Sequence, residues 1–165
     1  MKYYIIVLLL LFSQTNYAYA QNSITPSDLK VLQGDWTGSL TYIDYRSNKP
    51  YTMPADLVVK QGNNENQLSL HNSYPNEPKA NNKEKIKISK EGDYLNKKPI
   101  KSIDRSTEGQ IQITTEYTGK DNNQEALIRN VYILGENQFI IKKEVKFDNS
   151  DKWLKRNEFK YKRKL

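Results

Sequence analysis

The sequence predicts an all-β protein, an antiparallel up-and-down β-barrel of about eight to ten strands with one short N-terminal helix. Apolar and polar residues alternate with a period of two through most of the chain, which is typical of antiparallel strands with one wet face. Turn-forming residues interrupt the alternation about every ten residues. The connections are short and sequential, whereas Greek-key sandwiches need some long crossovers. These observations favour a meandering barrel.

The first expected element is a short helix from Asp28 to Gln33. Ser27 has the hydroxyl of a good N-cap, and Asp28 would place a negative charge in the first turn. A long strand then begins at Gly34 and ends at the turn 46–50. Glycine, asparagine and aspartate mark the later breaks, because they supply positive φ angles or local side-chain hydrogen bonds. These breaks fall at residues 62–66, 75–82, 91–93, 96–98, 108–109, 119–123, 135–137 and 148–151.

The strand alternation is clearest in the second half of the chain. Ile111, Ile113 and Tyr117 share one face of their strand, with polar residues between them. A later strand has the same pattern, with apolar residues on one face and Lys142, Glu144 and Lys146 on the other. The apolar residues of that strand are Phe139, Ile141, Val145 and Phe147.

The first twenty residues have the features of a secretory signal peptide. Lys2 precedes an apolar run from Tyr3 to Phe12, and Ala18-Tyr19-Ala20 is a small-x-small cleavage site. A membrane anchor is the alternative, but it would need about 20 apolar residues. We expect residues 1–20 to be removed, which leaves residues 21–165 as a single secreted or periplasmic domain. The chain has no cysteine, so it cannot form disulfides or carry a lipid on cysteine.

The formal charge is +7, and much of the excess lies near the C-terminus. A basic end of this kind can bind an anionic surface or a protein partner. It can also be the solvated face of an edge strand, since lysines keep edges from aggregating. Nucleic acid is not an expected partner, because no recognition motif accompanies the charge. The residues are Lys152, Lys155, Arg156, Lys160, Lys162, Arg163 and Lys164.

One motif stands at the head of the first long strand, Gly34-Asp35-Trp36-Thr37-Gly38. With the hairpins that follow and the segments 128–132, 139–145 and 153–159, it resembles the lipocalins and their exported bacterial lipocalin-like relatives. The resemblance implies a barrel whose closed end is plugged by Trp36. It also implies an arginine stacked on that indole, for which Arg156 is the first candidate and Arg129 the second. The chain lacks the lipocalin disulfide and a clear Thr-Asp-Tyr motif.

No catalytic, metal or cofactor site is expected. His71 is the only histidine and should point outward beside Ser69, whereas zinc sites need several His or Cys ligands. Haem barrels of the nitrobindin type carry their axial histidine late in the chain, and nothing after His71 can supply it. There is no nucleophile elbow, and the carboxylates are scattered. A hydrolase is the third and weakest hypothesis.

Two hypotheses of different classes remain open. The first is a non-catalytic barrel that binds a small, partly hydrophobic ligand inside. The second is a structural or protein-interaction domain of the bacterial envelope, whose interior the same side chains fill completely. The residues predicted to line the interior are Trp36, Leu40, Tyr42, Leu57, Val59, Leu68, Leu70, Ile113, Phe139, Ile141 and Val145.

Overall fold

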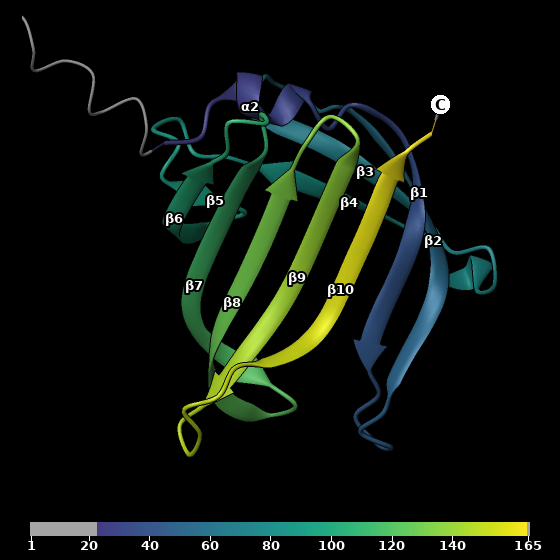
Figure 1. The fold of residues 1–165 in the computed structure, drawn as a ribbon, viewed down its shortest axis with the longest axis vertical. Coiled ribbons are helices and arrows are strands. Elements are labelled where there is room, and N and C mark those ends of the chain that lie inside the picture. Colours follow the sequence, from purple (N-terminus) through teal and green to yellow (C-terminus); the bar gives the residue numbers. More distant parts are fainter. Residues whose placement is uncertain (1–22, 165) are drawn as a thin grey trace, which may run out of the picture.

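The computed structural model describes residues 23–164, which form one ten-stranded antiparallel sheet rolled into a nearly closed barrel (Figure 1). The strand order β4-β3-β2-β1-β10-β9-β8-β7-β6-β5 joins chain neighbours throughout, except where β1 meets β10. The predicted fold class is confirmed. The strands are β1 (Gly34–Ile43), β2 (Pro50–Gln61), β3 (Gln67–Ser73), β4 (Asn82–Lys87), β5 (Tyr94–Leu95), β6 (Lys98–Arg105), β7 (Ile111–Asp121), β8 (Gln124–Leu134), β9 (Gln138–Phe147) and β10 (Leu154–Arg163).

The two ends of the sheet meet at β4 and β5. An isolated bridge joins Ile88 to Leu95, and the Asn96 amide donates to the Lys87 carbonyl at 2.7 Å. A one-turn 3-10 helix, η1 (Pro78–Ala80), lies in the connection between β3 and β4. These contacts between the two ends of the sheet are limited to residues 87–88 and 95–96, so the barrel is nearly closed rather than fully closed.

A short helix, α2 (Pro26–Lys30), lies across one end of the barrel (Figure 1). The sequence prediction placed this helix from Asp28 to Gln33 with Ser27 as its cap, and both details are wrong. Thr25 is the N-cap, because its hydroxyl accepts from the Asp28 amide while the Asp28 carboxylate accepts from the Thr25 amide at 2.8 Å. Proline at the first helical position fits this earlier start.

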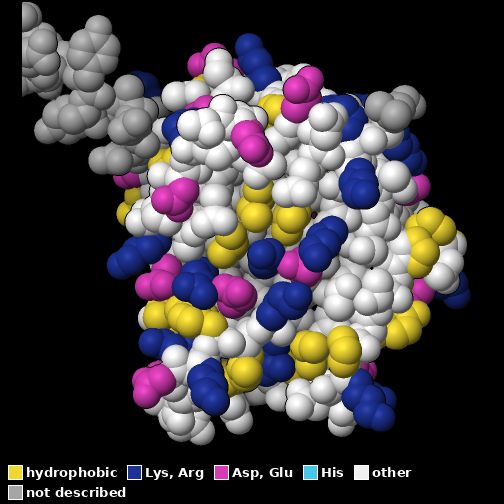
Figure 2. Space-filling view, in the orientation of Figure 1, with side chains coloured by type: hydrophobic (Ala, Val, Ile, Leu, Met, Phe, Trp, Pro, Cys, Tyr) yellow, Lys and Arg dark blue, Asp and Glu magenta, His cyan; other side chains and the backbone are white. Residues whose placement is uncertain are grey.

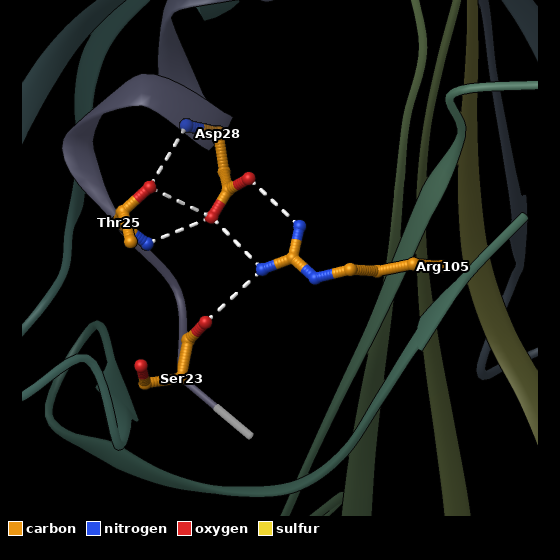
Figure 3. Close-up of polar contacts among 4 residues, drawn as sticks. All are labelled: Ser23, Thr25, Asp28 and Arg105. Carbon is orange, nitrogen blue, oxygen red and sulfur yellow. Dashed lines mark hydrogen bonds and ion pairs between the residues drawn. The ribbon is translucent and has the colours of Figure 1, made fainter. Parts of the chain in front are cut away.

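Asp28 also ties the helix to the sheet, as Figure 3 shows. The guanidinium of Arg105 at the end of β6 donates to the two carboxylate oxygens of Asp28 at 2.7 and 3.0 Å, and to the Ser23 carbonyl at 3.1 Å. A planar guanidinium suits this two-point geometry. The helix is therefore fixed over the barrel end. Its residue Leu29 packs into this end, and the Leu29 side chain is only 1% exposed.

Trp36 lies in the same closed end and is 0% exposed. Its indole nitrogen donates to the Leu32 carbonyl at 2.8 Å. The prediction that Arg156 stacks on Trp36 is wrong, because the guanidinium 4.2 Å from the ring centre belongs to Arg163. Arg163 lies directly opposite Trp36 in the β1–β10 pairing, and it donates to the carbonyls of Gln33 and Val31. It therefore joins β10 to the end of the helix segment as well as to the indole.

Candidate functional site

The inward-facing residues fall into two halves, of which the half next to α2 is solid. Seven residues predicted to line a ligand lie there, each 0–2% exposed and part of one continuous cluster. Solvent does not reach these side chains, so they form a packed core. They are Trp36, Leu57, Val59, Leu68, Leu70, Ile113 and Phe139.

The other half of the interior, which we call the mouth half, is partly open to solvent. Three more of the predicted lining residues, Leu40, Tyr42 and Ile141, pack against the core but are only half-buried. Phe159 has the same environment. Leu40 lies opposite Phe159 on β10, and Phe159 lies opposite Ile141 on β9. We call these three adjacent side chains, Leu40, Phe159 and Ile141, the apolar floor.

The next inward position on each strand, one step toward the mouth, is polar. Thr115 of β7 lies opposite Asn130, and Asn130 lies opposite Lys143 of β9. Lys143 lies opposite Asn157, which in turn lies opposite Tyr42. Inward neighbours on adjacent strands are close enough for side-chain contact. Thr115, Asn130, Lys143, Asn157 and Tyr42 therefore form one polar layer directly above the apolar floor.

Thr115 has an unusual place in this layer. It is 0% exposed, and its hydroxyl oxygen has no hydrogen-bond partner among the described residues. A buried hydroxyl without a partner is unfavourable by about 1–3 kcal/mol. Native structures leave few such groups, and each requires a physical explanation. A polar atom supplied by a bound molecule or a water would satisfy this one.

A charged cluster lies beyond the polar layer, centred on Asp121 at the end of β7. The Asp121 side chain is 1% exposed, and it accepts hydrogen bonds from Lys143 and Arg156 at 2.7 Å each and from the Tyr45 hydroxyl at 2.9 Å. The Arg156 guanidinium also lies 4.8 Å from the centre of the Tyr45 ring. We call Asp121, Lys143, Arg156 and Tyr45 the mouth cluster. Arg156, predicted to close the opposite end of the barrel, belongs here instead.

The electrostatics of Asp121 follow from this geometry. Burial raises the pKa of its carboxyl, but the hydrogen bonds from Lys143 and Tyr45 and the positive charge of Lys143 outweigh burial. The pKa of Asp121 therefore lies below its ordinary value. The pKa of Asp28 is lowered in the same way, since burial is outweighed by its bonds to Arg105 and Thr25.

Acid is expected to destabilise the barrel through these two carboxyls. Because their pKa values are lower in the folded state, their stabilisation is complete above the unfolded value of about 4 and is lost as pH falls through the folded values. The melting temperature should fall as pH is lowered from about 5 to 3. In Asp121→Asn the fall should be smaller, and an equal fall would show that Asp121 does not contribute. Scanning calorimetry at each pH provides the measurement.

The two remaining predicted site residues, Val145 and Arg129, lie on opposite faces of the sheet. Val145 faces the interior two residues beyond Lys143, and it is 0% exposed in a small buried cluster with Ala126 and Ile128 that fills part of the mouth half. Arg129, the second candidate for the indole, stacks at 4.0 Å on Trp153 instead and pairs with Glu144 at 2.8 Å.

The sequence prediction included Tyr42 but missed the other members of the polar layer. Lys143 interrupts the apolar alternation between Ile141 and Val145, and this was the available signal for an inward lysine. Asn130 and Asn157 gave no comparable signal, because asparagine is ordinary on the wet face of a strand.

The outer face of β1, β9 and β10 carries Lys155, Lys160 and Lys162 of the basic residues that the sequence singled out. Arg156 and Arg163, in contrast, face the interior. Glu158 is 6% exposed and pairs with Lys155 at 3.2 Å and Lys160 at 3.3 Å, with Lys142 at 3.8 Å. Figure 2 shows acidic side chains among basic ones in the middle of this face, below a hydrophobic group. A groove of about 510 Å³ on the same face has Ile140, Lys160 and Lys162 among its lining residues.

The fold and the site together define a class, a nearly closed ten-stranded antiparallel barrel with a solid end and a polar, partly open mouth half. The sequence matches no protein-family model and no curated protein. Among solved structures, the crystal structure of Rv2717c from M. tuberculosis matches with a TM-score of 0.48 and 9% identity, over 84% of this chain and 98% of that one. A DUF3598-family protein of unknown function from Nostoc punctiforme matches with a TM-score of 0.39 and 11% identity, over 87% of this chain and 51% of that one.

Two further observations concern residues 23–164 alone. Residues 23–164 include no helix with the length and apolar character needed to cross a bilayer. They also bring together no group of three or more His, Cys, Asp or Glu side chains that could hold a metal ion.

Proposed function

We propose that the protein is a non-catalytic binding barrel that holds one small, partly hydrophobic molecule in its mouth half. The observation that carries this proposal is the apolar floor of Leu40, Phe159 and Ile141, which is half-buried without a ligand. Covering exposed apolar area yields about 25 cal/mol per Å². The polar layer above the floor would orient the ligand, because binding sites pair an apolar lining with a few polar groups. Thr115 would gain its missing hydrogen bond.

The test is saturable binding of a neutral apolar dye such as Nile red to the purified protein. Wild-type protein should increase the dye's fluorescence, and Ile141→Trp, which fills the space above the floor, should reduce the affinity at least tenfold. Ile140→Trp is the matched control, since the neighbouring side chain lies on the outer face and lines the outer groove. It should bind dye like the wild type. Thermal melting followed by circular dichroism would verify that both variants fold. Leu40→Trp, which also fills the space above the floor, is a second blocking variant and should reduce dye affinity in the same way.

The alternative function, an interaction domain with a filled interior, also has specific support. The solid half contains most of the residues once expected to line a cavity, and the groove at Ile140 lies on the outer, basic face. Absence of dye binding by the wild type would favour this alternative. Loss of binding in Ile140→Trp alone would move the site to the outer groove.

Export is part of the proposal. It rests on Lys2, the apolar run and Ala18-Tyr19-Ala20, all of which precede the residues that the structure describes. N-terminal sequencing of protein from the cell envelope or medium should begin at Gln21. A chain that retains Met1 would contradict export.

A further inference from the structure

We propose that the ligand of the mouth half carries a carboxylate, and that this group binds between Lys143 and Arg156. The inference rests on the proposed function, because it assigns the chemistry of the same site. Two cationic side chains face the single carboxylate of Asp121, so the cluster has one positive charge in excess. A ligand with one negative charge would balance it.

The cationic groups also have donors to spare. Arg156 uses Nε for Asp121, and its two terminal nitrogens make no hydrogen bond to another residue of the described chain. Lys143 uses Nζ for Asp121, and an ammonium group has three donors. The terminal edge of a guanidinium matches the two oxygens of a carboxylate. Arg156 can therefore hold Asp121 through one edge and a ligand carboxylate through the other.

Burial makes this charge effective. The side chains of Arg156 and Lys143 are only 13% and 28% exposed. Charge-assisted hydrogen bonds are stronger when water is partly excluded. The Tyr45 ring lies over the guanidinium and limits its movement, since the two are 4.8 Å apart. The site is thus largely preorganised, and a ligand would not have to order a freely moving arginine.

The position of the cluster also fixes the orientation of the ligand. Lys143 lies two residues from Ile141 on β9, which is a separation of about 7 Å along the strand. The apolar part of the ligand would lie on the floor, and its carboxylate would point toward the mouth. Asn130 and Asn157 lie between these two regions and can bind polar atoms near the carboxylate.

The side of the barrel formed by β4, across from β9 and β10, would disfavour binding of the ligand carboxylate because it carries negative charge. Burial raises the pKa of Tyr74, and the negative charge of Glu84 on β4 raises it further. The pKa of Tyr132 is raised to about 12, again mainly by burial, and Glu84 also contributes. Glu84 is exposed, but it lies opposite the buried Leu70 and two residues from the buried Ile86, so it is on the inward face of β4. A ligand anion would be attracted to β9 and β10 and repelled from β4.

The experiment is displacement of Nile red by a matched pair of short amphiphiles, decanoate and decanol, used below their aggregation limits. With wild-type protein, decanoate should displace the dye at a concentration at least tenfold lower than decanol. Lys143→Met should reduce this ratio to about two or less, and Arg156→Gln should do the same. In both variants the affinity for decanol should change little. Lys120→Met is the control for net charge, because Lys120 is 68% exposed beside Asp121, and it should keep the wild-type ratio.

Asp121→Asn should change decanoate affinity in the direction opposite to the Lys143 and Arg156 variants. It removes the carboxylate that competes for both cations, so decanoate should bind more tightly than to the wild type. If Nile red binds but decanoate and decanol displace it equally, or if the Lys143 and Arg156 variants keep the wild-type ratio, this inference is wrong and the binding function stands. If Nile red does not bind the wild type at all, the proposed function itself fails.

Discussion

Replacing Trp36 with alanine is expected to lower the free energy of unfolding by about 3–5 kcal/mol, the usual range for removing a large buried aromatic side chain. The indole is 0% exposed and meets Phe139 edge-on, with ring centres 6.1 Å apart. The substitution would leave a cavity at the closed end of the barrel. It would also leave the Leu32 carbonyl without its indole donor and Arg163 without its aromatic partner. Such losses add to the cavity term.

Urea unfolding followed by circular dichroism would measure this change. Trp153→Ala is the matched control, because Trp153 is the other tryptophan and stacks on Arg129 on the outer face. Its removal should lower the free energy of unfolding by about 1 kcal/mol or less, as for an exposed cation–π contact. Equal effects of the two substitutions would contradict the assignment of Trp36 as the plug of the closed end.

Replacing Gly38 with alanine is expected to destabilise the barrel by about 3 kcal/mol or more, above the usual range for overpacking. Gly38 lies in β1 opposite Tyr161 of β10. A Cβ atom at this position would lie 1.9 Å from the Lys160 carbonyl oxygen and 2.9 Å from the Tyr161 Cα. Both neighbours are backbone atoms of a paired strand, so relief of the clash requires β1 and β10 to separate.

Thermal and urea unfolding of Gly38→Ala would show this effect as a lower midpoint or as failure to fold. Gly119→Ala is the control, since its new Cβ would meet the tip of the Ile128 side chain at 3.0 Å. A flexible side chain can move by a few tenths of an ångström, so the loss should be about 1 kcal/mol or less. A harmless Gly38→Ala substitution would mean that β1 and β10 are less closely paired than described.

The errors in the sequence prediction have particular physical origins. The alternation of Phe159, Tyr161 and Arg163 extends the inward face of β10 to Arg163, so the true partner of Trp36 was accessible from periodicity. Arg156 lies where the β9–β10 register shifts between Lys155 and Asn157, and a bulge of this kind redirects side chains. The N-cap was misplaced because Ser27 and Thr25 are both good capping residues, and the choice depends on which carboxylate completes the capping box.

Local periodicity and turn chemistry alone are enough to predict the strands, the turns, a short helix before the first strand and the buried tryptophan. Which half of the interior is filled and which is partly open to solvent follows only from the three-dimensional arrangement of the strands. The apolar floor joins Leu40, Ile141 and Phe159 from three strands, and the mouth cluster adds Asp121 and Tyr45 from other parts of the chain. Their meeting depends on strand order and register, which follow from closure of the whole sheet.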